Sequence, residues 1–193
     1  MCRDRLFGRS PLHFVTKRPY GWFRPEELDQ LIERTLREGI GVINIVRDPR
    51  DVLTSTHAGD TTRRFYVEPE RWRASIAAAD ELFTRLDAYP HKLTLRYEDV
   101  VTDPAATEQA LSATFSLKLR PNIDSIGRLK DNLERLEAST RMAKFMQNIR
   151  NFDPATIGRW RTDPEKMAYL DGLFTKSDIR EELRQFMERY DYP

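Results

Sequence analysis

Arg47 and the residues after it form the part of this sequence best suited to bind an anion. The apolar run Val42–Val46 predicts a buried strand, and Arg47 follows it directly. Asp48 is a good N-cap residue and Pro49 a good first helical residue, so a helix is expected to begin there. Free backbone N–H groups and the positive dipole end of a helix favour an anion. Ser55, eight residues after Arg47, could turn its hydroxyl to the same face.

A solvated turn explains the same residues without any ligand. Arg47 and Arg50 alternate with Asp48 and Asp51, and exposed ion pairs of this kind contribute at most about 1 kcal/mol. On this hypothesis Ser55 is an ordinary helix residue. The segment alone therefore leaves both hypotheses open.

Alternating strands and helices must position this segment. Short apolar runs predict strands at Leu12–Thr16, Val42–Val46 and Leu93–Arg96. Amphipathic helices are predicted between them, one from Pro25 to a stop at Gly39 and one from Pro69 to Leu86. This order predicts an α/β fold, a three-layer sandwich in which a short parallel sheet is flanked by helices.

The C-terminal part of the chain is predicted to be helical. Asp103 caps one helix, apolar residues from Ile126 to Leu136 mark another, and a capping box from Asp178 to Glu181 starts the last. No repeat or linker divides the sequence. Residues 1–193 are therefore expected to form a single domain.

Composition and charge exclude several classes of function. The 32 basic and 31 acidic residues leave a net charge of +1, so no overall field favours nucleic acid. No run approaches the roughly 20 apolar residues of a membrane span, and the charged N-terminus lacks the apolar centre of a signal peptide. A single cysteine and three histidines show no zinc spacing. We expect a cytoplasmic protein without a metal, and its oligomeric state is not specified.

Three motifs in a fixed order resemble those of sulfotransferases that use 3′-phosphoadenosine 5′-phosphosulfate (PAPS). The first is a strand followed by Arg-Asp-Pro-Arg-Asp at 47–51 and a serine at 55. The second is a strand ending in Tyr-Glu-Asp at 97–99, and the third is Ile-Gly-Arg-Trp-Arg at 157–161. The resemblance covers roughly Phe14 to Arg161, most of the chain.

The resemblance implies a role for each matched residue. Arg47 and Ser55 would grip the 3′-phosphate of the nucleotide, and Tyr97 would lie near the adenine. Gly158 and Arg159 would close over the same phosphate. PAPS would be the co-substrate, and no metal would be required. Without the resemblance, a tyrosine that ends a strand is more often a core ring with a hydrated hydroxyl, and Tyr97 could be one.

The catalytic residues depart from the family pattern. Lys17 matches a lysine that faces the phosphosulfate in that family, but Arg18 and Pro19 follow it where the catalytic histidine should stand. Sulfonate transfer needs cations near the leaving phosphate and a base for the acceptor proton. Lys17 supplies the first, while His57 and Glu68 are candidates for the base and could equally be ordinary loop residues.

Two adjacent carboxylates, Glu98 and Asp99, could suggest an acid–base pair. Neighbouring side chains diverge in direction, so we expect them to serve loop structure instead.

The family's N-terminal phosphate loop, a Pro-Lys-Ser/Ala-Gly-Thr/Ser-like segment, has no counterpart in this sequence. The chain therefore resembles a family member truncated at the N-terminus. Loss of that loop would remove the backbone N–H groups that cradle the phosphosulfate.

Three functional hypotheses follow. The first is a sulfotransferase that moves a sulfonate group from PAPS to a hydroxyl or amine of a small-molecule or carbohydrate acceptor, with the segment from His57 to Trp72 as the acceptor wall. The second is a catalytically incomplete nucleotide-binding or interaction module with the same fold. The third is a helical α/β domain that binds no nucleotide. The matched residues favour the first, and the missing loop favours the second.

Overall fold

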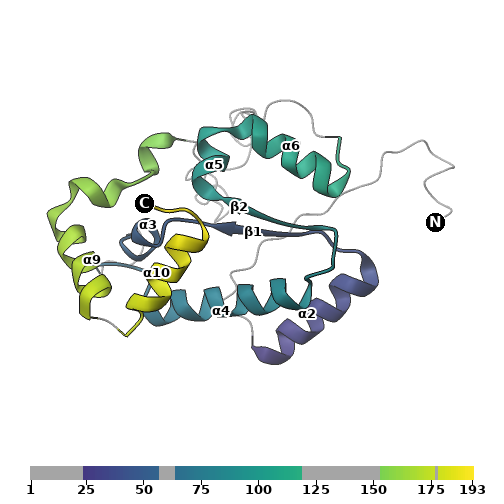
Figure 1. Cartoon of the computed structure of the whole chain (residues 1–193), viewed down its shortest axis with the longest axis horizontal. Helices are drawn as coiled ribbons and strands as arrows, with labels where there is room; N and C mark the ends of the chain where they lie inside the picture. The colour runs from purple at the N-terminus through teal and green to yellow at the C-terminus, as the bar shows by residue number, and fades with distance from the viewer. Residues whose placement is uncertain (1–23, 57–63, 119–152, 177) are drawn as a thin grey trace, which may run out of the picture.

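The computed structural model describes residues 24–56, 64–118, 153–176 and 178–193 (Figure 1). The elements in this part of the chain are α2 (Pro25–Glu38), β1 (Val42–Val46), α3 (Pro49–Leu53), α4 (Pro69–Arg85), β2 (Lys92–Arg96), α5 (Tyr97–Thr102), α6 (Pro104–Phe115), the 3-10 helices η3 (Pro154–Thr156) and η4 (Arg159–Thr162), α9 (Pro164–Lys176) and α10 (Arg180–Arg189). The alternation of helix and strand predicted from residue 25 to residue 96 is confirmed. The predicted strand Leu12–Thr16 and the apolar stripe from Ile126 to Leu136 lie outside the described residues.

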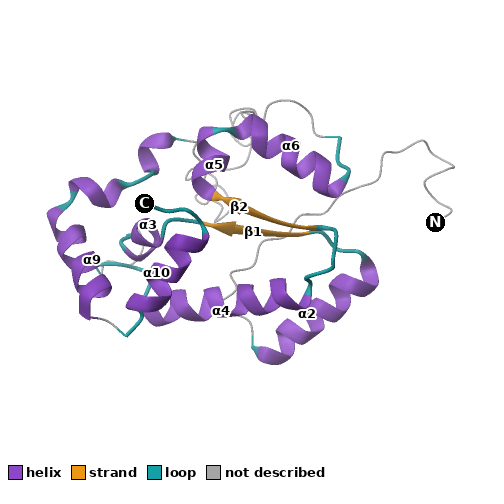
Figure 2. Ribbon diagram, viewed as in Figure 1, coloured by secondary structure: helices purple, strands orange, loops and turns teal. Residues whose placement is uncertain are grey.

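In the described part of the chain, β1 and β2 form a two-stranded parallel sheet (Figure 2). Val46 lies opposite Arg96, so both strands end at the same edge. The connection between them runs through α3 and α4, because parallel strands need a long crossover. Arg47 and Tyr97, the residues that follow the two strands, are therefore brought to one edge of the sheet.

The two faces of β1 are covered unequally. Asn44 and Val46 are only 6% and 5% exposed, whereas Ile43 and Ile45 on the opposite face are 40% and 59% exposed. In the view of Figure 1 the strands lie between the pair α2 and α4 and the pair α5 and α6. The described residues form a mixed fold of helix and strand in which one face of β1 is buried.

Helix α2 has the start and stop signals that its sequence predicted. Pro25 is the first residue, the backbone N–H of Arg24 donates to Glu27 Oε2 at 3.0 Å, and Gly39 ends the helix with a φ of 69°. That left-handed conformation favours glycine. The predicted apolar face is buried only in part, because Leu28 is covered while Leu36 is 54% exposed.

Helix α4 packs against α2 through a small apolar cluster. It spans Pro69–Arg85, and Leu86 is its C-cap residue, in agreement with the predicted helix from Pro69 to Leu86. Leu82 and Leu86 are fully buried and meet Leu28 and Ile32 of α2. This cluster holds the two helices together beneath the sheet, away from the edge where the strands end.

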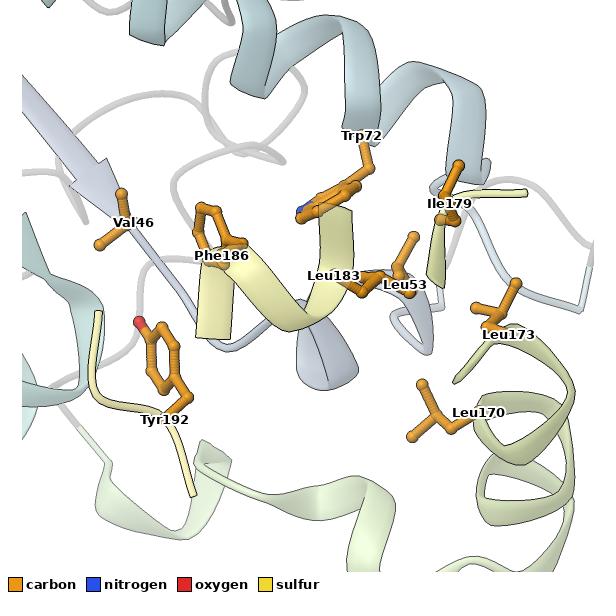
Figure 3. Packing of buried hydrophobic residues seen from close by; sticks show 9 residues of the cluster. All are labelled: Val46, Leu53, Trp72, Leu170, Leu173, Ile179, Leu183, Phe186 and Tyr192. Atoms are coloured by element: carbon orange, nitrogen blue, oxygen red, sulfur yellow. The ribbon is translucent and has the colours of Figure 1, made fainter. Parts of the chain in front are cut away.

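The main core lies next to the carboxyl ends of the strands (Figure 3). The ring of Phe186 on α10 meets the ring of Trp72 on α4 edge to face at 5.4 Å. The buried members of this cluster are Val46, Leu53, Trp72, Leu170, Leu173, Ile179, Leu183, Phe186 and Tyr192. The core therefore joins the end of β1, α3, α4, α9 and α10.

The predicted capping box before the last helix is wrong. Helix α10 begins at Arg180 after Ile179, which is fully buried and provides no side-chain cap. Asp178 instead accepts a hydrogen bond from the guanidinium of Arg73 on α4 at 3.0 Å. Attraction to the opposite charge thus draws this carboxylate away from the helix start. The helical character predicted for this end of the chain is confirmed by α9 and α10.

The apolar cluster between α2 and α4 generates a stability prediction. Leu82→Ala is expected to lower the free energy of unfolding by about 2–5 kcal/mol, because it leaves a cavity at a side chain with no exposure. Urea denaturation followed by circular dichroism measures the change. Leu36→Ala, at a side chain that is 54% exposed, is the control and should change it by less than about 0.5 kcal/mol.

Candidate functional site

The first motif forms a tight turn at the carboxyl end of β1. Arg47 follows the strand, and Asp48 caps α3 by accepting the backbone N–H of Arg50 at 2.9 Å on Oδ1. Pro49 is the first helical residue, as the sequence predicted. Tyr97 opens α5 directly after β2. Both residues therefore project from the edge where, in open parallel sheets, ligands bind.

Arg47 is held by contacts from three separate segments. Its Nη2 donates to the carbonyl oxygen of Thr156 at 2.9 Å and lies 3.6 Å from Asp51 Oδ2. Its guanidinium carbon lies over the Tyr97 ring, 4.4 Å from the centroid. The Nε–H is buried and has no hydrogen-bond partner among the described residues. Arg47 thus keeps one unsatisfied donor while its side chain is 31% exposed.

Asp51 connects the first motif to the third. Its side chain is only 3% exposed, and Oδ2 accepts the backbone N–H of Gly158 at 2.8 Å. Gly158 has a φ of 71°, a left-handed conformation that other residues rarely adopt. A glycine therefore suits the backbone at this position. The same carboxylate fixes the third motif and faces Arg47.

Arg50 is occupied by other partners. Its Nε and Nη2 form a forked pair with the two carboxylate oxygens of Asp48, at 2.9 and 2.8 Å. The guanidinium also lies over the Trp160 ring, 4.6 Å from its centroid. Arg50 thus provides a second attachment of the third motif to the turn.

The hydroxyl of Tyr97 contacts η3, the 3-10 helix whose Thr156 carbonyl also accepts a hydrogen bond from Arg47. The oxygen lies 3.3 Å from Thr156 Oγ1, and Thr156 in turn donates to the carbonyl of Asp153 at 2.7 Å. Tyr97 is therefore the donor to Thr156. Arg47 covers one face of the Tyr97 ring. The ring thus has contacts with both Arg47 and η3 rather than a purely core position.

Glu98 joins the second motif to the first. It is 8% exposed, and its Oε1 accepts the backbone N–H of Asp48 at 3.0 Å. Its Oε2 accepts the hydroxyl of Tyr192 at 2.8 Å. Asp99 is 62% exposed at its side chain and lies 3.9 Å from Arg96. The two carboxylates diverge as expected, and Glu98 has a structural role that sequence reasoning did not specify.

Ser55 lies beyond the end of α3, so it is not an ordinary helix residue. The helix ends at Leu53, and Thr54 is its C-cap residue, whose backbone N–H and hydroxyl both donate to the carbonyl of Arg50, at 3.2 and 2.6 Å. Ser55 follows this end, and its own carbonyl accepts the N–H of Tyr66 at 2.9 Å. Within the described ranges no hydrogen bond connects Ser55 to Arg47.

The structure places the other predicted residues as follows. Arg159 lies on the same segment as Gly158, but its Nε donates to the carbonyl of Ala155 at 3.0 Å and its Nη2 lies 3.9 Å from Asp153. Glu68 is an exposed residue just before α4. Lys17 and His57 lie outside the described residues. Arg47, Tyr97 and Gly158 are therefore the predicted residues that come together.

The proposed acceptor wall is described only from residue 64 onward. Arg64 pairs with Glu165 at 2.8 Å, and the Phe65 ring lies 4.6 Å from the ring of Tyr169 on α9. Burial raises the pKa of Tyr169 above its usual value, and the negative charge of Glu70 adds to this effect. This segment therefore packs along α9.

Within the ranges that the structure describes, no group of three or more His, Cys, Asp or Glu side chains could hold a metal ion. No helix in those ranges is long and apolar enough to cross a membrane.

Comparison with known proteins gives no relative. No family model, curated protein or solved structure matches the chain. The site is therefore interpreted from its own geometry and from the order of its motifs.

Asp51 is expected to be required for the attachment of the third motif. Asp51→Asn removes the charge that faces Arg47 and weakens the bond to Gly158, so the free energy of unfolding should fall by about 1–3 kcal/mol. Chemical denaturation measures the loss. Asp99→Asn makes the same chemical change at an exposed carboxylate and should cost less than about 0.5 kcal/mol. Equal losses in the two variants would contradict a special role for Asp51.

Proposed function

We propose that this chain is a PAPS-dependent sulfotransferase that moves a sulfonate group from PAPS to a hydroxyl or amine of a small-molecule or carbohydrate acceptor. One observation carries the proposal: three motifs far apart in the sequence converge on Arg47, at the edge where two parallel strands end. A solvated turn, the alternative for this segment, would not need Asp51 and Glu98 to be buried.

The residues around Arg47 are suited to a phosphate group. Arginine is always charged and presents several N–H donors in a plane, which matches phosphate geometry. The buried Nε–H of Arg47 is a donor without a partner in the described part of the chain. Tyr97, with its ring beside the guanidinium, offers an aromatic surface next to the charge. This combination favours a nucleotide whose phosphate binds Arg47.

The proposal assigns roles in accordance with these contacts. Arg47 binds the 3′-phosphate, and Tyr97 lies near the adenine. Gly158 and Arg159 belong to the segment that closes over the phosphate, and Ser55 is a further ligand from the end of the turn. PAPS supplies the sulfonate, and this chain's residues bind and orient it. The proposed fold is a three-layer sandwich in which helices flank a short parallel sheet.

Transfer requires groups beyond the 3′-phosphate site. Lys17 offsets the charge that develops on the leaving phosphate oxygen, and His57 accepts the acceptor proton. The role of Lys17 rests on the resemblance, whereas His57 is a candidate only because imidazole can accept a proton. A chain that binds the nucleotide but transfers nothing would be the incomplete module of the second hypothesis.

Nucleotide binding is the first test. The purified chain should bind adenosine 3′,5′-bisphosphate about tenfold or more tightly than AMP in isothermal titration calorimetry, because a charge-assisted hydrogen bond to the 3′-phosphate contributes about 1.5–3 kcal/mol. Arg47→Ala should remove most of this preference while AMP binding changes little. Arg47→Lys keeps the charge but lacks the Nε–H, so its affinity should fall between the two.

Arg85→Ala is the matched control for charge. It removes one arginine at the C-terminal end of α4, near the start of β2 and thus at the opposite end of the strands, where Arg85 pairs with Asp29. Its affinity for the bisphosphate should equal that of the wild type. The proposal is wrong if the wild-type chain binds AMP and the bisphosphate equally, or if Arg47→Ala binds normally.

Sulfonate transfer is tested with radiolabelled PAPS and a panel of hydroxyl, amine and carbohydrate acceptors. Lys17→Ala should lower turnover more than it weakens the bisphosphate product, because its charge acts chiefly in the transition state. His57→Ala tests the base separately, and an unchanged rate would leave that role to Glu68 or to water. Unchanged turnover in Lys17→Ala would exclude Lys17 from the reaction.

A further inference from the structure

Tyr192 is a buried polar residue that none of the three motifs contains. It follows α10, is 7% exposed, and its ring belongs to the main core, stacked 6.2 Å from the Phe186 ring (Figure 3). The guanidinium of Arg96, at the end of β2, lies over the same ring at 4.6 Å. Burial raises the pKa of Tyr192 well above its usual value, and the bond to Glu98 adds to this effect. The hydroxyl therefore stays protonated and acts as a hydrogen-bond donor.

This hydroxyl is linked to the anion site through one carboxylate. Tyr192 donates to Glu98 Oε2 at 2.8 Å, and Glu98 Oε1 accepts the backbone N–H of Asp48 at 3.0 Å. Glu98 and Asp48 are 8% and 5% exposed. Hydrogen bonds to an ionised group are about twice as strong as those between neutral groups. Glu98 thus connects Tyr192 to the residue that follows Arg47.

The link acts on both sides of the Arg47 side chain. Asp48 follows Arg47 directly in the chain, and Glu98 follows Tyr97. The Tyr97 ring lies 4.4 Å from the Arg47 guanidinium. A displacement of Glu98 would therefore move the turn and the aromatic ring together.

We propose that Tyr192 is a positioning residue for the anion site: its hydroxyl orients Arg47 and Tyr97 through Glu98 without touching the ligand. The inference rests on the proposed function, because the group that Arg47 is oriented to bind is the 3′-phosphate. A side chain that served only to fill the core would need no hydroxyl, since phenylalanine fills the same space.

Tyr192→Phe tests this role, because it keeps the ring and removes the hydroxyl. In ¹⁵N NMR of the full chain, the amide of Asp48 should exchange with solvent faster in the variant, relative to amides inside α2. Titration should show about three- to tenfold weaker binding of adenosine 3′,5′-bisphosphate, the scale of one hydrogen bond. The affinity for AMP should fall by less, because AMP shares the adenine near Tyr97 but lacks the 3′-phosphate that Arg47 binds.

Tyr190→Phe is the matched control, since it removes a hydroxyl from the neighbouring tyrosine, whose ring packs on Phe186. It should change neither the exchange of Asp48 nor the binding of the bisphosphate. Glu98→Gln serves as a second variant if Tyr192→Phe does not fold, because it keeps the shape and weakens both hydrogen bonds. The same loss of bisphosphate affinity and of Asp48 protection is expected.

The outcomes separate this inference from the proposed function. Normal bisphosphate binding by Tyr192→Phe overturns the positioning role, as does an equal loss of bisphosphate and AMP affinity. If the wild-type chain binds no bisphosphate, the proposed function fails and the exchange measurement still decides whether Tyr192 fixes the turn. Unchanged exchange at Asp48 in the variant overturns that link.

Discussion

The positive charge of Arg47 is the constraint on which the arrangement of the site depends. Its guanidinium lies where the two strands end, with the side chain 31% exposed, so water alone does not solvate it. The chain supplies a carboxylate from α3, a carbonyl from η3 and an aromatic face from α5, through Asp51, Thr156 and Tyr97. These partners come from separate segments. Completing the surroundings of Arg47 therefore requires α3, η3 and α5 to be packed together at the end of the sheet.

Buried carboxylates in this site bind backbone N–H groups as well as arginines. Asp48 accepts the N–H of Arg50, Asp51 that of Gly158, and Glu98 that of Asp48. Burial of a carboxylate is costly unless its oxygens are hydrogen-bonded, and each of these bonds offsets part of that cost. The same bonds fix the path of the backbone in all three motifs. The negative charge thus serves to shape the turn, while the Nε–H of Arg47 is left without a partner in the described residues.

Local patterns in the sequence were sufficient for the two described strands and for the bounds of α2 and α4. The strand Val42–Val46 and the proline-initiated helices follow from short apolar runs and capping residues. The length of α3 was not predictable in this way, because the helix ends at Leu53 although no glycine or proline stands between Leu53 and Ser55. The contact of Asp51 with Gly158 spans 107 residues, and that of Glu98 with Tyr192 spans 94. Such pairings leave no periodic signal.

The fluorescence of Trp160 can report whether residues 153–161 stay attached to α3. Its ring lies against the guanidinium of Arg50, its indole N–H is buried without a partner in the described ranges, and Gly158 holds the same segment to α3. Detachment of residues 153–161 would hydrate this indole and move its emission to longer wavelength. Trp72, 4% exposed in the main core, would keep its emission until the core itself unfolds. Of the three tryptophans, Trp160 therefore reports on the opening of residues 153–161 and Trp72 on the loss of the fold.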